Sequence, residues 1–158
     1  MENLRKNDLE FLRKSIEVAR EAREHGNHPF GAILVDEAGE ILLTAENTVE
    51  TEKDCTGHAE TNLMRKATKE YDAEKLAECT LYSSTEPCIM CCGAIFWGNV
   101  RRVVFGLSGT ELYKMSPGTE EMLYIHCSEV MSRGKKAVEV IGPLIEEEAI
   151  KVHDNFWS

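Results

Sequence analysis

Short apolar runs that alternate with amphipathic stretches constrain the fold of this chain more than any other sequence feature. Two apolar runs, 30–35 and 40–45, flank the turn-forming residues 36–39 and predict a β-hairpin. From residue 58 onward, stretches with helical character separate single short apolar runs. The predicted helices are 7–25, 58–70, 87–97, 120–133 and 143–155, and the predicted strands are 30–35, 40–45, 79–84, 100–107 and 137–141. This order predicts an α/β fold, a mixed sheet with helices on its faces.

Helix signals are clearest near the N-terminus. Apolar residues recur every three or four positions between 7 and 25, and Asp8 and Gly26 occupy positions typical of a helix start and stop. Residues 107–118 contain two glycines and a proline and are predicted to form a loop. The chain has 158 residues and contains neither a repeat nor a linker. We therefore expect a single domain that spans residues 1–158.

The net charge bears on the kind of partner that this chain can bind. The sequence holds 18 Lys and Arg against 28 Asp and Glu, which gives −10 at pH 7. Such a surface repels the phosphate backbone of nucleic acid, and the basic pairs Arg101-Arg102 and Lys135-Lys136 are short. We therefore expect a small neutral substrate and no nucleic-acid partner.

The sequence also bears on where the protein is found. It contains no run of about 18 apolar residues, so we expect no membrane partner. The first residues lack the apolar stretch of a signal peptide. We therefore expect a cytoplasmic protein whose cysteines stay reduced.

Two short segments concentrate the residue types that bind metals. Residues 57–60 read Gly-His-Ala-Glu, and residues 86–91 read Glu-Pro-Cys-Ile-Met-Cys. Pro87 suits the first position of a helix, where its missing N–H is not needed. Cys88 and Cys91 then share one face of the first turn, where unpaired N–H groups favour the thiolate. A cysteine pair in this position predicts zinc binding.

The number of candidate ligands indicates the type of zinc site. His58, Cys88 and Cys91 are three candidates, whereas structural zinc sites use four protein ligands. A catalytic site keeps three ligands and leaves the fourth position for water, whose activation needs a nearby proton acceptor. Glu60 is the candidate for that role. The remaining cysteines are isolated: Cys55, Cys79, Cys92 and Cys127.

The combination of HAE with PCxxC resembles the signature of the zinc-dependent cytidine/nucleobase deaminase superfamily. The resemblance extends from about residue 28 to residue 107 and includes HPFGAILV, AEN and TLYSSTEPCIMCCGAIFWGNVRRVVFG. The last segment is similar to the branch that contains guanine deaminases and tRNA adenosine deaminases. The likeness fades after Leu107, and the choice of substrate in this family depends on that segment and on the C-terminus. Cys55 stands where many relatives have proline.

The resemblance implies a fold and a set of functional residues. The implied fold is cytidine-deaminase-like, a three-layer α/β/α arrangement with a five-stranded mixed sheet. One Zn²⁺ per chain is implied, bound by His58, Cys88 and Cys91, with Glu60 as the proton shuttle. The implied substrate contacts near the sheet are Phe30, Asn47 and Ala59. A homodimer or larger homo-oligomer is implied as well.

The C-terminal segment has two interpretations. In several relatives such a tail closes over the base, so residues 143–158 are a candidate lid. Phe156 and Trp157 could then stack on a planar base, and Asp154 could accept its N–H groups. Alternatively, the aromatic residues anchor the last helix to the core.

Several activities are compatible with these motifs. The favoured one is hydrolytic deamination of a free nucleobase or related amino-heterocycle, with guanine first, giving xanthine and ammonia. A tRNA adenosine deaminase and a cytosine or nucleoside deaminase are the alternatives. A non-catalytic zinc-binding assembly module comes last, because Glu60 is present. Outside the motifs, we expect Cys92 to face the core, His126 and Cys127 to pack on a helix, Trp97 to lie in the core or an interface, and His28 to have no role.

Overall fold

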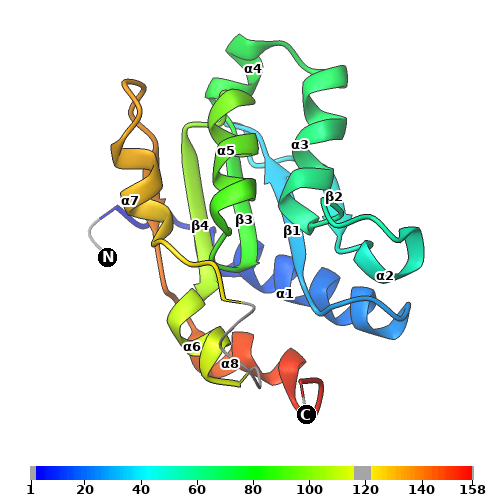
Figure 1. Ribbon diagram of the computed structural model, residues 1–158. Coiled ribbons are helices and arrows are strands. Elements are labelled where there is room, and N and C mark those ends of the chain that lie inside the picture. Colours follow the sequence, from blue (N-terminus) through cyan, green and yellow to red (C-terminus); the bar gives the residue numbers. More distant parts are fainter. Residues whose placement is uncertain (1–2, 116–121, 158) are drawn as a thin grey trace.

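The computed structural model describes residues 3–115 and 122–157. Five strands form one mixed sheet in the order β2-β1-β3-β4-β5 (Figure 1). The strands are β1 Gly31–Val35, β2 Ile41–Glu46, β3 Thr80–Thr85, β4 Arg102–Leu107 and β5 Glu139–Ile141. β1 pairs antiparallel with β2 and β3, whereas β3–β4 and β4–β5 are parallel. The predicted hairpin and the predicted five-stranded mixed sheet are confirmed.

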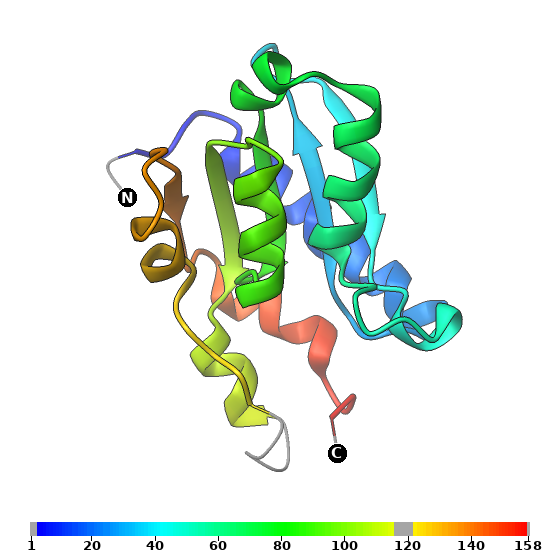
Figure 2. The same cartoon turned by 45° about the horizontal axis from the view of Figure 1, so that its top comes forward.

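Helices cover both faces of this sheet (Figures 1 and 2). α3, α5 and α7 lie on one face, and α1 crosses the other. The helices are α1 Asp8–Glu24, α2 Val49–Glu52, α3 Ala59–Glu70, α4 Ala73–Ala77, α5 Ile89–Trp97, α6 Gly109–Met115, α7 Cys127–Ser132 and α8 Glu146–Ala149, which continues as the 3₁₀ helix η1 Ile150–His153. None of those described is both long and apolar enough to cross a bilayer.

The two faces of the central strands supply two separate cores. Ala32 and Leu34 pack beneath α3 and α5, whereas Ile33 and Val35 pack against α1. Successive side chains of a strand point to opposite faces, so burial on both faces requires the continuous apolar run of β1. Gly31 begins this strand where α1 passes closest, because a Cβ there would lie 2.4 Å from the backbone nitrogen of Ala19. The absence of a side chain thus lets α1 pack against the start of β1.

After β4, the observed secondary structure differs from the prediction in two segments. The loop predicted for 107–118 is wrong, because α6 occupies Gly109–Met115. The helix predicted for 120–133 is wrong in its first half as well: residues 122–126 are not helical, and α7 begins at Cys127. Residues 116–121 lie outside the described part. Long-range hydrogen bonds to Glu86 hold Tyr124 and Cys127 in place, and local sequence patterns do not contain them.

The predicted helix 143–155 begins later than expected. Residues 143–145 are not helical, because the backbone N–H of Leu144 donates to the carbonyl of Gly106 at 3.1 Å and ties this stretch to β4. The helix predicted for 87–97 begins at Ile89, so Pro87 is not its first residue. The short helices α2 and α4 were not predicted.

Candidate active site

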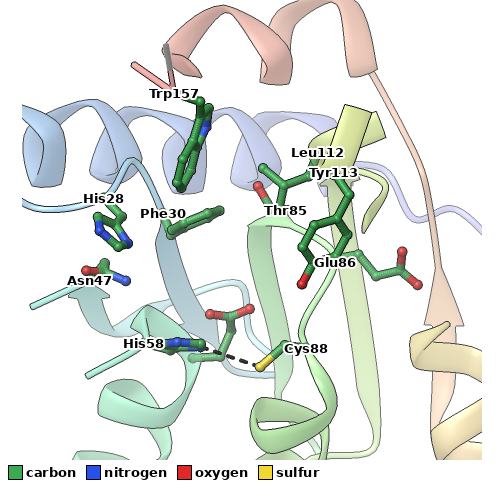
Figure 3. Close-up of a pocket in the computed structure, with 11 residues that line it drawn as sticks. His28, Phe30, Asn47, His58, Thr85, Glu86, Cys88, Leu112, Tyr113 and Trp157 are labelled. Atoms are coloured by element: carbon green, nitrogen blue, oxygen red, sulfur yellow. Dashed lines mark hydrogen bonds between the residues drawn. The ribbon is translucent and has the colours of Figure 1, made fainter. Parts of the chain in front are cut away.

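The candidate site is a cavity of about 230 Å³ where two helices begin beside the ends of the central strands (Figure 3). Residues far apart in the sequence meet there: the chain before β1, the end of β2, the N-termini of α3 and α5, helix α6 and the C-terminal segment. The lining residues are His28, Phe30, Asn47, His58, Glu60, Thr85, Glu86, Cys88, Leu112, Tyr113 and Trp157.

The three predicted metal ligands come together at the floor of this cavity. His58 is the N-cap of α3, Cys88 is the N-cap of α5, and Cys91 lies in the first turn of α5. The His58 Nδ1 atom is 3.4 Å from the Cys88 Sγ atom and 3.6 Å from the Cys91 Sγ atom. Tetrahedral zinc, with bonds of about 2.3 Å to sulfur and about 2.1 Å to nitrogen, needs a nitrogen–sulfur separation of about 3.6 Å. The donor set and its spacing therefore fit one zinc ion.

The pKa values of the two thiols are shifted by their mutual contact and by burial. A hydrogen bond from Cys91, together with one from His58, lowers the pKa of the Cys88 thiol to about 4. The same bond to Cys88, with burial, raises the pKa of Cys91. The N-terminus of a helix also favours a thiolate, which is the form that binds metals. Cys88 is thus the thiol that loses its proton more readily, and both cysteines bind a metal as thiolates.

Glu60 lies beside the ligands, in the first turn of α3. Its side chain is buried, and the Ser83 hydroxyl oxygen is 3.1 Å from its Oε2 atom. Burial raises the pKa of Glu60 to about 7, and the Cys88 thiolate adds to this effect. A carboxyl group with a pKa near neutrality can both accept and donate a proton. The position of Glu60 therefore suits the predicted proton shuttle.

Of the three predicted substrate contacts near the sheet, two lie on the cavity wall and one does not. Phe30 and Asn47 line the cavity, whereas Ala59 is buried and is not a lining residue. The Asn47 Oδ1 atom accepts a hydrogen bond from the N–H of Val49 at 3.0 Å. Within residues 3–115 and 122–157, nothing accepts a hydrogen bond from the amide nitrogen of Asn47. That nitrogen can therefore serve a ligand as a donor.

Part of the C-terminal tail reaches the cavity, as expected of a lid, and part anchors the tail to the rest of the protein. Trp157 lines the cavity, opposite Tyr113 (Figure 3). Phe156 packs instead beneath the Arg23 guanidinium, whose carbon lies 5.3 Å from the ring centre, and Asp154 is exposed. Neither Phe156 nor Asp154 is a lining residue. One tail residue thus reaches the cavity while another anchors the tail to α1.

Sequence reasoning missed several lining residues, and the reason differs among them. His28 was given no role, yet it lies on the cavity wall, with its ring centre 5.5 Å from that of Trp157. Leu112 and Tyr113 lie on α6, in the segment predicted as a loop. These two residues could have been predicted to line the cavity only if the segment had been recognised as a helix. Thr85 and Glu86 are the other missed lining residues, and the buried Oγ1 atom of Thr85 has no hydrogen-bond partner in the described part of the chain.

Glu86 borders the cavity, but its carboxylate points away from it (Figure 3). Its Oε1 atom accepts hydrogen bonds from the Gly109 N–H and the Tyr124 hydroxyl, each at 2.8 Å. Its Oε2 atom accepts one from the N–H of Cys127, also at 2.8 Å. A single buried carboxylate thus connects the segment between β3 and α5 to the starts of α6 and α7.

The residues outside the motifs also have defined positions. Cys92 is buried, as predicted, and Cys127 is buried at the start of α7. His126 is exposed and occupies the N-cap position of α7, without a side-chain capping hydrogen bond, rather than packing on the helix. Trp97 is 82% exposed, so the prediction of a core position is wrong and the interface alternative remains.

Comparison with known proteins connects this geometry to a family. A probable cytosine deaminase of Schizosaccharomyces pombe is 45% identical over 157 residues, which cover 98% of this chain and 95% of that protein. A guanine deaminase of Bacillus subtilis is 40% identical over 102 residues, 64% of this chain and 65% of that protein. A solved structure from a study of A-to-I editing by tRNA:A34 deaminases has a TM-score of 0.72 and 27% identity, covering 91% of this chain and 99% of that one.

A family profile covers the site directly. Residues 5–107 match the cytidine and deoxycytidylate deaminase zinc-binding region. The matched stretch contains His58, Cys88, Cys91 and Glu60, and their spacing in the structure fits a zinc ion with a neighbouring proton acceptor. The chain belongs to the zinc-binding cytidine and deoxycytidylate deaminase family and is a zinc-dependent hydrolase of C–N bonds.

Proposed function

We propose that this chain deaminates a free nucleobase by hydrolysis. The observation that carries the proposal is the position of Glu60 beside the His58, Cys88 and Cys91 cluster, at the floor of a cavity of about 230 Å³. Aromatic side chains form much of the wall, namely Phe30, Tyr113 and Trp157. Such a space suits a flat heterocycle held between aromatic faces.

The chemistry divides between the metal and the chain. Zinc, when bound, lowers the pKa of a water molecule and so supplies the nucleophile near neutral pH. Glu60 accepts the proton that this water gives up and delivers it to the leaving amino nitrogen. The water oxygen bonds to the amine-bearing carbon and becomes the ring carbonyl, its second proton passes to the adjacent ring nitrogen, and the bond from that carbon to the amino group breaks to release ammonia. The Ser83 hydroxyl lies between the Glu60 carboxylate, at 3.1 Å, and the Thr85 carbonyl, at 2.7 Å.

The neighbouring residues orient the ring in this proposal. Asn47, which lines the cavity, offers its amide nitrogen to a ring oxygen or nitrogen, whereas Ala59 is buried behind the wall and is given no contact. Phe30 and Trp157 flank the ring faces. We give Asp154 and Phe156 no contact with the base, because they lie away from the cavity wall.

Two rings are candidates. Guanine is favoured by the sequence around the cysteine motif, which is similar to purine-type members. Cytosine is favoured by a separate observation: the S. pombe relative matches this chain almost throughout, including the region after Leu107 on which substrate choice depends. The match to the guanine deaminase covers only 64% of this chain.

A tRNA substrate is less well supported than either free base. The chain carries a net charge of −10, and no Lys or Arg occurs among the described residues that line the cavity. Phosphate contacts supply much of the affinity for nucleic acid, and Lys and Arg make most of them. We therefore propose a small-molecule substrate rather than RNA.

The test is ammonia release by the purified, zinc-loaded protein. The panel contains guanine, cytosine, their nucleosides, adenine and a tRNA anticodon stem-loop. We expect release from one or more free bases and none from the stem-loop. Release from the stem-loop alone contradicts the proposal, and silence on every compound with zinc bound supports the assembly-module alternative. The ratio of kcat/KM for guanine and cytosine decides between the two rings.

We also propose that the protein self-associates. Trp97 is 82% exposed at the end of α5, and Met90 at the start of the same helix is 37% exposed. Beside Trp97 lies a shallow hollow whose lining residues on α3 and α5 include Thr61, Met64 and Ala94. Exposed large apolar side chains beside a hollow are typical of protein interfaces.

A further inference from the structure

His153 is a buried residue that no step of the proposed chemistry uses. It ends η1, and its side chain is 2% exposed. The indole N–H of Trp157 donates a hydrogen bond of 3.0 Å to the Nδ1 atom of His153. Trp157 is the last described residue and lines the cavity (Figure 3). A buried histidine thus holds a side chain that forms part of the substrate cavity.

The surroundings of His153 keep its ring in the form that this contact needs. Nδ1 can accept a hydrogen bond only while it is unprotonated. Burial, with a smaller effect from the Arg23 charge, lowers the pKa of His153 to about 4. The Nε2 atom is buried without a hydrogen-bond partner in the described part of the chain. Near neutral pH the ring is therefore neutral, and its contact with Trp157 is the hydrogen bond that orients it.

Packing also fixes the residues around His153. The His153 ring meets that of Phe30 edge to face, with the centres 5.5 Å apart. Arg23 on α1 donates a hydrogen bond of 2.9 Å to the carbonyl of Val152 and covers the Phe156 ring. The two Arg23 contacts attach the tail to α1. The direction of the Trp157 indole then depends on its contacts with the aromatic residues and on the hydrogen bond to His153.

We propose that His153 is a positioning residue that fixes the Trp157 indole as one wall of the substrate cavity. The inference rests on the proposed function, because it concerns the substrate face of the same site. An indole that is already oriented presents its flat face without the entropic cost of ordering a side chain on binding. His153 is not a lining residue, so its effect should fall on substrate binding rather than on the chemical step.

Matched substitutions test this role. His153→Leu removes the acceptor, whereas His153→Asn keeps an acceptor oxygen close to the place of Nδ1. We expect His153→Leu to raise KM about three- to tenfold, as for the loss of one hydrogen bond, with little change in kcat. His153→Asn should restore KM to within about twofold of the original value.

A double-mutant cycle separates the hydrogen bond from general packing. Trp157→Phe keeps an aromatic ring but removes the N–H donor. If His153 acts through that donor, His153→Leu adds little to the KM increase in the Trp157→Phe background. If the factors by which the two single substitutions raise KM simply multiply in the double variant, the inference is overturned, as it is by equal KM values for the Leu and Asn variants.

A spectroscopic readout needs no substrate. Trp97 and Trp157 are the two tryptophans of the sequence, so Trp97→Phe leaves Trp157 as the sole indole emitter. In this background we expect His153→Leu to shift the emission to longer wavelength and to increase quenching by acrylamide, and His153→Asn to do neither. Unchanged emission and quenching in the Leu variant would count against the inference. An emission shift without turnover of any ring would contradict the proposed function while supporting the positioning of Trp157 by His153.

Discussion

Glu60 is the single residue on which the proposed proton transfer depends. Glu60→Gln keeps the size of the side chain but cannot take up a proton, so we expect kcat to fall by about 10²- to 10⁴-fold. Zinc content, measured by elemental analysis, should stay at that of the unchanged protein. Glu70→Gln, at the exposed end of the same helix, is the matched control and should leave kcat unchanged. Normal turnover by the Glu60→Gln variant would contradict the mechanism.

The metal site makes a separate prediction at the level of single cysteines. Cys88→Ser or Cys91→Ser replaces one of three ligands, so each variant should lose most of its zinc and all measurable turnover. Cys55→Ser changes an exposed thiol outside the cluster and should keep one zinc per chain. The measurement is the zinc-to-protein ratio after gel filtration. Full zinc occupancy in both ligand variants would show that other residues bind the metal.

Residues of the site were predictable where a short motif carries them. His58 with Glu60, and Cys88 with Cys91, are each within three positions along the chain, and one helix N-terminus places each pair. His28 has no such local signal, because its place on the cavity wall depends on a tail more than a hundred residues away. Sequence patterns indicate local geometry only, whereas the positions of the remaining lining residues depend on tertiary packing.

At the scale of elements, α6 gives the clearest test of how the site is held together. Glu86 accepts a hydrogen bond from Gly109 at the start of α6, and that helix carries Tyr113 to the cavity. In Glu86→Gln one carboxylate oxygen becomes an amide group that cannot accept, so a buried N–H or the Tyr124 hydroxyl loses its partner. We expect a loss of about 1–3 kcal/mol in the free energy of unfolding and a lower kcat/KM.

The control for this prediction lies on α6 itself. Glu111 pairs only with Lys114 at the surface among the described residues, so Glu111→Gln should change the free energy of unfolding by less than about 0.5 kcal/mol. Urea unfolding monitored by circular dichroism measures both variants. Equal stability of the Glu86→Gln variant and the unchanged protein would mean that the connection through Glu86 does not hold α6 in place.

Helices and strands were predicted correctly where the spacing of nearby apolar residues determines them. The prediction failed where contacts with residues distant in the sequence determine the conformation. The β1–β2 hairpin and the long helix α1 follow directly from the spacing of apolar residues. Residues 122–126 have a composition compatible with a helix, but hydrogen bonds from Tyr124 and Cys127 to Glu86 keep this stretch extended along the site. Here tertiary interactions override local preference.

At the scale of the whole molecule, the candidate site and the exposed Trp97 lie in different places. The cavity end carries the ligands and the aromatic wall, whereas Trp97 lies at the opposite end of α5. Self-association centred on Trp97 would therefore place the contact at the end of α5 away from His58 and Cys88. This separation allows assembly and activity to be tested independently.

The final prediction concerns that assembly. Trp97→Glu places a charge in the centre of the proposed interface, so we expect a dimer to become a monomer at micromolar concentration. Ile41→Glu, which changes an apolar residue that is 41% exposed on the edge strand β2, should leave the dimer intact. Sedimentation velocity over a hundredfold range of concentration measures both variants. A monomeric unchanged protein, or a Trp97→Glu variant that remains a dimer, would rule out this face, and dissociation by Ile41→Glu alone would move the interface to the sheet edge.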